Sequence, residues 1–204
     1  APTIIAEEEK TDPDFKEKFI CEIISRDEAR ELEQVHFSYQ IPISLAVLTH
    51  LTRHRMHSLM VPNFVPLWNF DDYIIPDTIK NSDMLKRYKK AVETNKKVME
   101  EFRNAGVIEE GLVFFYLGAQ MCNVVTTMNA RSLIWFSRMR CCNRAQWQIR
   151  HIANVMTNEA KKVAPLIGRG FGPSCVVDHV CNEGKKSCGL LKAILEKVNG
   201  LSYN

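Results

Sequence analysis

Acidic residues are absent from two long stretches of this sequence. No Asp or Glu occurs between Glu33 and Asp71 or between Glu110 and Glu159, which leaves 37 and 48 residues, 85 in all, without an acid. At the overall frequency of 24 acids in 204 residues, these stretches would hold about ten. They nevertheless contain five of the six histidines and seven arginines: Arg53, Arg55, Arg131, Arg138, Arg140, Arg144 and Arg150.

Burial in a core explains missing acids, but it does not explain the arginines. A buried guanidinium needs a partner, so each arginine must meet either a distant acid or a bound anion. The planar fork of arginine suits phosphate, and the apolar residues around it favour a pocket over an open basic surface. The sequence therefore favours an anionic small ligand. Nucleic acid is disfavoured, because the lysines lie elsewhere and the net charge is only +3.

Composition places the chain among ordinary globular proteins. It has 204 residues, 46% of them apolar and 25% charged, which fits one domain or one domain with a small appendage. No apolar run reaches the length of a membrane span, and the start has no signal-peptide pattern, so we expect no membrane association. Seven cysteines are an odd number. They favour reduced thiols and a cytoplasmic location over a disulfide framework.

Periodicity and breaker residues predict an α+β fold. Near the start we expect a flexible arm over 1–16, a helix over 27–34, a strand over 35–41, and a helix that begins at Pro42 and carries 44–54. The remaining predicted elements are a loop with packed rings over 60–76, a helix over 83–104 capped by Ser82, a strand over 120–128, helices over 130–139 and 143–163 with Asn143 as the second cap, a Gly/Cys-rich tail over 168–190 and a last helix over 190–198.

The densest cationic group is Arg53-His54-Arg55 with His50 and His57. On a helix, residues 50, 54 and 57 would share one face. That spacing could hold a metal, but no carboxylate ligand is near and the arginines would repel a cation. A helix end that faces an anion is favoured, and a structural role for His54 stays open.

A second group, Asn129, Arg131, Arg140 and Gln146, is predicted on two successive helices. Asn and Gln offer a donor and an acceptor together, as recognition of a pyrimidine or flavin ring edge requires. An arginine beside such a ring could stabilise a deprotonated ring nitrogen. Hydrolase, P-loop and Rossmann functions have no support, because the chain has no Ser-His-Asp order and no Gly-rich phosphate loop.

Two motifs resemble those of the flavin-dependent thymidylate synthase family. RHRMHS (53–58) is similar to its RHRxxS signature, and NARSLIWFSRMRCCNRAQWQIR (129–150) is similar to its NARSL…AQxEIR segment. FSY (37–39) falls where a family strand is expected. The resemblance covers about residues 35–165 and implies a family domain over 17–167, with mixed helices packed on an antiparallel sheet. A Gly/Cys-rich tail and a C-terminal helix would follow over 168–204.

The resemblance implies a homotetramer that binds FAD and converts dUMP to dTMP with methylenetetrahydrofolate and NADPH. By position it implies the following assignments: FAD binding by Arg53, His54, Arg55, Asn129, Ala130 and Arg131, substrate binding by His50, Arg53 and Arg140, and a catalytic role for Arg140 in the ionisation of the uracil N3. No metal is implied.

The sequence departs from the family at its nucleotide contacts. A glutamate, a serine and an arginine of the family signature are replaced by Val61, Asn63 and Val65, and a phosphate-binding arginine is replaced by Val113. Each charge-assisted contact is worth about 1.5–3 kcal/mol, so the loss amounts to several kcal/mol. Near the flavin, Trp135 replaces an asparagine and Arg144 a histidine, and a histidine-rich loop has no counterpart in 25–36.

Three interpretations therefore stay open. The chain is a thymidylate synthase with a rearranged nucleotide site, a family enzyme that acts on another pyrimidine nucleotide, or a non-catalytic paralogue. Because family sites are shared among subunits, such a paralogue could form a hetero-oligomer with an intact copy and supply its flavin contacts.

The tail carries four soft ligand atoms, on Cys175, His179, Cys181 and Cys188. These residue types suit structural zinc, but their spacing matches no standard finger. A metal, a disulfide or redox pair, and plain thiols are the three alternatives, of which plain thiols are favoured. Cys141 and Cys142 are expected to serve packing.

Overall fold

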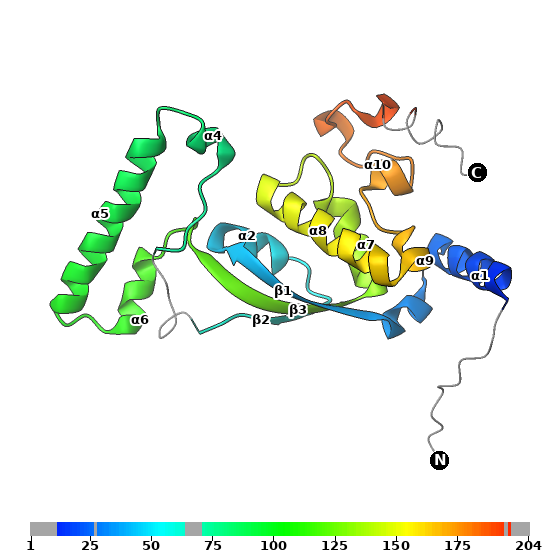
Figure 1. The fold of residues 1–204 in the computed structure, drawn as a ribbon, viewed down its shortest axis with the longest axis horizontal. Coiled ribbons are helices and arrows are strands. Elements are labelled where there is room, and N and C mark those ends of the chain that lie inside the picture. Colours follow the sequence, from blue (N-terminus) through cyan, green and yellow to red (C-terminus); the bar gives the residue numbers. More distant parts are fainter. Residues whose placement is uncertain (1–11, 27, 64–70, 194–195, 197–204) are drawn as a thin grey trace, which may run out of the picture. The chain divides into compact units, whose positions relative to one another are not determined.

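A computed structural model describes residues 12–193, apart from 27 and 64–70, together with residue 196. The chain divides into two compact units (Figure 1). The terminal unit comprises Ala1–Phe37 and Met128–Asn204, and the central unit comprises Ser38–Thr127. In the part of the chain that the structure describes, no helix has both the length and the apolar character needed to cross a bilayer.

The central unit contains most of a small sheet, whose strand order is β1-β3-β2. Its strands are β1 (His36–Ser44), β2 (Ser58–Met60) and β3 (Met121–Asn129). β2 pairs antiparallel to β3, with Ser58 opposite Thr127. Side chains of β3 alternate between buried and more exposed positions, as a strand with one covered face requires. The strands predicted over 35–41 and 120–128 are confirmed, and so is the mixed α and β class.

Helix α2 (Leu45–Leu51) is held against the start of β3 within the central unit. The Ser44 hydroxyl accepts a hydrogen bond from the Val47 N–H at 3.3 Å and caps the helix. The Ala46 N–H donates to the Gly118 carbonyl at 2.9 Å, and a Cβ at Gly118 would already lie 3.4 Å from the Ala46 Cβ. This close approach fixes the position of the first turn of α2.

The predicted helix over 44–54 is wrong at both ends. Pro42 belongs to β1, where a proline is tolerated because β1 is an edge strand of the sheet. The helix starts only after Ser44 and ends at Leu51, three residues short of the prediction.

The rest of the central unit is helical. Its elements are α4 (Asp77–Lys80), α5 (Leu85–Asn104), α6 (Glu109–Leu112) and the 3-10 turn η2 (Val113–Phe115). Tyr88 of α5 donates to the Ile74 carbonyl at 3.0 Å, and Phe102 packs on Phe115 with ring centroids 5.1 Å apart. Ser82 does not cap α5 directly, because its hydroxyl accepts from Met84, the residue before the helix. The rings of Phe64, Trp68 and Phe70 in the predicted loop over 60–76 lie outside the described residues.

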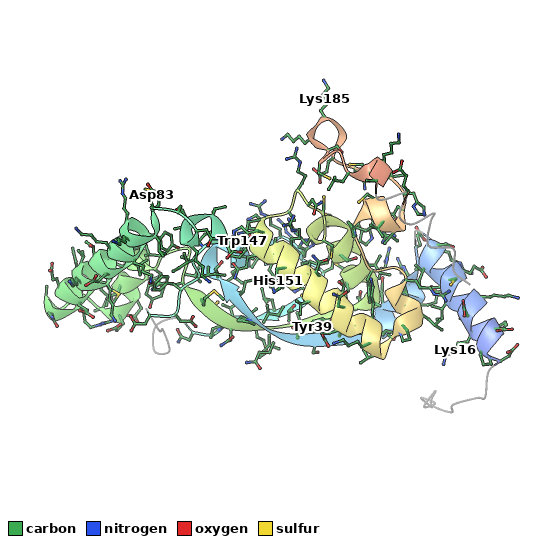
Figure 2. The ribbon with its side chains drawn as sticks, turned by 45° about the horizontal axis from the view of Figure 1, so that its top comes forward. Lys16, Tyr39, Asp83, Trp147, His151 and Lys185 are labelled. Carbon is green, nitrogen blue, oxygen red and sulfur yellow. The ribbon has the colours of Figure 1, made fainter. Side chains whose placement is uncertain are left out.

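The terminal unit is built from helices around α7 and α8, with Trp147 and His151 marking the first turns of α8 in Figure 2. Its elements are α1 (Pro13–Ser25), the 3-10 turn η1 (Arg30–Gln34), α7 (Ala130–Arg140), α8 (Trp147–Val163), α9 (Pro165–Gly168), α10 (Ser174–Val177) and the 3-10 turn η3 (Gly184–Lys186). Leu133 and Phe136 of α7 and Ile149 of α8 are fully buried and form its core. The helix predicted over 130–139 is confirmed.

Three boundaries of the terminal unit differ from the predictions. Helix α1 starts at Pro13, inside the predicted arm, because the Asp12 carboxylate accepts from the Asp14 N–H and proline suits a first turn. The cap of α8 is Gln146, since Asn143 receives the Arg150 guanidinium instead. In the described residues of the segment predicted as a helix over 27–34, the regular structure is the 3-10 turn η1 alone.

At the C-terminal end, residues 191–193 and 196 are helical. The remainder of the predicted last helix over 190–198 lies outside the described residues, except for residue 190.

Candidate active site

In the central unit, the first arginine group follows α2 as a turn. The His54 N–H donates to the Leu51 carbonyl at 3.0 Å, and this short bond ends the helix. Arg53 and Arg55 are exposed on either side of the half-buried His54. Among the described residues neither guanidinium has a hydrogen-bond or ion-pair partner. Two free guanidinium groups two residues apart can bind an anion without first giving up a partner.

The predicted helical face of residues 50, 54 and 57 does not form. His50 lies on α2, His54 in the turn and His57 just before β2, because the helix ends at Leu51. Within the described ranges, no group of three His, Cys, Asp or Glu side chains is arranged to hold a metal ion.

His57 fastens the end of the RHRMHS segment to the central strand. Its Nδ1 lies 2.7 Å from the Thr126 hydroxyl, and that hydroxyl lies 3.0 Å from the Ser58 carbonyl, to which it donates. A hydroxyl has one proton to give, so Nδ1 is the donor in the first bond. Burial lowers the pKa of His57 and favours its neutral form. The turn that carries Arg53 and Arg55 is thus held from both sides.

In the terminal unit, the NAR motif forms the start of α7. The Asn129 side-chain oxygen (Oδ1) accepts from the Ser132 N–H at 2.8 Å and caps the helix. Ala130 is fully buried, and its N–H donates to the Val35 carbonyl at 2.8 Å. The Arg131 guanidinium is paired with the Glu33 carboxylate. Asn129 therefore keeps its NH₂ group as the donor it can offer, and Arg131 is already oriented by an acid.

The other arginines of the second acid-free stretch also meet partners inside the terminal unit. Arg138 forms a bidentate pair with Asp178, with contacts of 2.8 Å, and this pair lowers the pKa of that carboxyl. Arg144 donates to the carbonyls of Lys186 and Ser187, and Arg150 donates to Asn143. Distant acids and carbonyls thus account for arginines that have no acid near them in the sequence.

Arg140 lies at the C-terminal end of α7, and Gln146 caps the start of α8. Arg140 is half-buried at the last position of α7. The Gln146 side-chain oxygen accepts from the N–H groups of Gln148 and Ile149 at 2.8 and 3.1 Å. We predicted that Gln146 offers both a donor and an acceptor to a ligand. Its side-chain oxygen is already occupied by the first N–H groups of α8, so the acceptor part of that prediction is wrong.

The positions that depart from the family are surface-exposed where the structure describes them. Val61 is 38% exposed, Val113 is 37% exposed and Trp135 is 58% exposed. Val65 lies outside the described residues. The replaced positions thus do not fill a core, and apolar side chains stand at the surface where the resemblance implies charged contacts.

The predicted site residues fall into one group per unit. His50, Arg53, His54 and Arg55 belong to the central unit, and Asn129, Ala130, Arg131 and Arg140 belong to the terminal unit. Sequence reasoning missed the supporting residues Glu33, Val35 and Thr126. Glu33 and Thr126 lie 98 and 69 residues from the groups they hold, and no local pattern marks them.

Comparison with known proteins identifies relatives of this chain. The family model described as "Thymidylate synthase complementing protein" matches residues 2–166. A flavin-dependent thymidylate synthase of Clostridium tetani is 34% identical over 191 residues, which covers 84% of this chain and 76% of that protein. Those of Geobacter sulfurreducens and Sulfurisphaera tokodaii are 32% and 33% identical, each over 84% of this chain and over 75% and 77% of their own lengths.

The chain therefore belongs to the thymidylate synthase complementing protein family. Its relatives bear the name flavin-dependent thymidylate synthase, as the two sequence motifs indicated. The family model matches residues up to 166 and does not extend over the cysteine-containing tail.

Proposed function

We propose that this protein is an FAD-dependent thymidylate synthase that methylates dUMP to dTMP, with methylenetetrahydrofolate as carbon donor and NADPH as reductant. The observation that carries the proposal is the exposure of Arg53 and Arg55 and their lack of a partner among the described residues. These two guanidinium groups are exposed and unpaired among the described residues, on a turn braced by α2 and by His57. Such a turn fits an anionic cofactor such as FAD.

The two residue groups have distinct tasks in this proposal. Arg53, His54 and Arg55 bind FAD through its charged part. The Asn129 NH₂ group donates to a ring edge, and Arg131 is oriented by Glu33. Ala130, whose side chain is buried, is assigned to FAD binding by its position in the NAR motif. FAD, reduced by NADPH, supplies the reducing equivalents for methyl formation.

The substrate lies beside His50, Arg53 and Arg140 in this proposal. Arg140 places positive charge beside the uracil N3, where negative charge develops on ionisation. Because family sites are shared among subunits, we propose a homotetramer. We also propose a cytoplasmic location.

A second candidate function rests on the exposed valines. Val61 and Val113 offer no charge to a nucleotide phosphate, although both side chains are accessible. A catalytically degenerate paralogue would bind flavin and assemble with an intact copy, and a family enzyme for another pyrimidine nucleotide would use other contacts.

The decisive experiment is a turnover assay for dTMP with dUMP, methylenetetrahydrofolate and NADPH. It is run on the protein alone and again with a catalytically silenced intact relative that supplies only nucleotide contacts. Formation of dTMP by the protein alone supports the proposal and rejects the paralogue. Activity only in the mixture supports the paralogue. Absence of activity in both, with flavin bound, rejects dUMP as the substrate.

A further inference from the structure

Five of the seven cysteines gather around one cavity of the terminal unit. Cys141 and Cys142 end α7, Cys175 belongs to α10, and Cys181 and Cys188 flank η3. All five line a cavity of about 170 Å³. Cys141 is buried and stands near the Thr157 hydroxyl, while the other four are at least partly accessible and free. The structure thus replaces the predicted set of Cys175, His179, Cys181 and Cys188, because His179 does not line the cavity and Cys142 does.

The tail that carries three of these thiols has almost no core of its own. From residue 175 to residue 193, all of which the structure describes, no side chain is buried. The segment contains only part of the four-residue helix α10, the three-residue turn η3 and residues 191–193 as regular structure. A metal ion or a disulfide is the usual staple where a small structure lacks an apolar core, and cysteines are the residues that could supply one here.

Polar contacts bring the tail to the cavity, and two of its sulfur atoms make long, weak hydrogen bonds. Cys142 Sγ lies 3.9 Å from a Glu183 carboxylate oxygen and accepts from the Arg144 N–H at 3.4 Å, and Cys181 Sγ lies 3.4 Å from the Ser187 hydroxyl. Asp178 pairs with Arg138, and the carbonyls of Lys186 and Ser187 accept from Arg144. His179 and Gly184 have positive φ angles of 57° and 51°, so the chain turns sharply between Cys175 and Cys181 and between Cys181 and Cys188. The side chain of Lys185 extends away from the ribbon in Figure 2, which leaves that cation outside the thiol cluster.

We propose that Cys142, Cys175, Cys181 and Cys188 form a structural site for a thiophilic divalent metal ion of the zinc class. Four cysteine sulfurs are the ligand set that structural zinc prefers. The described side chains do not form such a group as they stand, so the proposal requires the four sulfurs to move toward one another when the ion binds. The ion would fasten the tail to the end of α7.

The test starts with the whole protein, purified with a reductant and without chelators. Zinc is measured per chain as purified and after incubation with Zn²⁺, and Co²⁺ is used as a spectroscopic substitute. We expect about one zinc per chain and, with Co²⁺, the charge-transfer absorption of a thiolate complex. Zinc below about 0.2 per chain under both conditions, or Co²⁺ without that absorption, overturns the proposal.

Variants separate this site from other thiols. Cys175→Ser and Cys188→Ser should each lower the zinc content at least fivefold, whereas the matched control Cys21→Ser, in α1, should keep it. If a variant fails to fold, the Co²⁺ spectrum of the unaltered protein still decides. A loss of two thiols on treatment with oxidised glutathione, prevented by Cys142→Ser and without any bound zinc, would instead show a disulfide. Flavin content, measured on the same samples, tests the proposed function independently.

Discussion

The two units of this protein treat their arginines differently. In the terminal unit, Arg131 and Arg138 are paired with Glu33 and Asp178, acids that lie outside the acid-free stretch. In the central unit, Arg53 and Arg55 are exposed without a partner among the described residues. The lack of acids nearby in sequence therefore does not by itself indicate a ligand-binding arginine. We infer from this contrast that the paired arginines chiefly stabilise the fold. The unpaired arginines are then the main candidates for ligand binding.

The largest effect is expected from removing the unpaired charges. The double variant Arg53→Gln/Arg55→Gln loses two charge-assisted contacts of about 1.5–3 kcal/mol each, so FAD affinity should fall by about 10²-fold or more. The melting temperature should hardly change, because both side chains are exposed. Equilibrium dialysis with FAD measures the change. Arg87→Gln, an exposed arginine on α5, is the matched control, and equal flavin affinity in both variants would refute the assignment.

Asn129 allows the helix cap to be separated from a ligand contact. Asn129→Ala removes the cap and should lower the free energy of unfolding by about 1 kcal/mol. Asn129→Asp keeps the capping oxygen but loses the NH₂ donor, so it should keep the stability and weaken FAD binding. Urea unfolding and FAD titration on both variants give the answer. An Asp variant with unaltered FAD affinity would make Asn129 a cap only.

The Arg138–Asp178 pair should contribute stability that depends on pH. Arg138 lowers the pKa of Asp178 in the folded state, so the contribution is present above the unfolded pKa of about 3.9 and is lost as the pH falls through the folded pKa. Asp178→Asn should lower the free energy of unfolding by about 1 kcal/mol at pH 7, since the pair is partly exposed.

Urea unfolding of both proteins from pH 7 into the acid range measures this difference, which should shrink as the pH falls. Glu22→Gln, which breaks an exposed pair with Arg26, serves as the control with an effect of about 0.3–0.5 kcal/mol. A pH-independent difference for Asp178→Asn would contradict the ion-pair account.

The smallest expected effect concerns His57. Burial lowers its pKa in the folded state, so the unfolded chain binds the proton more readily once the pH falls below about 6.5. Stability is therefore unaffected by this group above that pH and decreases below it. His57→Gln should flatten the decrease between pH 7 and 5 in thermal melts. Identical slopes for the two proteins would show that His57 does not contribute.

Local sequence patterns were sufficient to predict a strand or a helix where the element is determined by residues close together in the sequence. The β-branched residues of the segment 120–128 predicted β3 closely, and the helix predicted over 130–139 matches α7. The RHRMHS and NAR motifs also identified the residues that the site proposal now uses. These features depend on neighbours in the sequence, which is why they could be predicted.

Boundaries and pairings depended on distant residues and could not be predicted. Pro42 remains in a strand because that strand lies at the edge of the sheet, and α2 is positioned by Gly118 and Gln120. The partner of Arg131 lies 98 residues away. Cys142 joins the tail cysteines only after α7 and α10 have come together. Such contacts are set by the fold as a whole.

The central claim is that the unpaired arginine turn of the central unit serves a flavin, and absorption spectroscopy tests it most directly. The purified protein is incubated with FAD, dialysed and scanned in the visible range. The account predicts a retained flavin band equivalent to about one FAD per chain. A protein that shows no flavin band after this treatment, while still folded by circular dichroism, would contradict it.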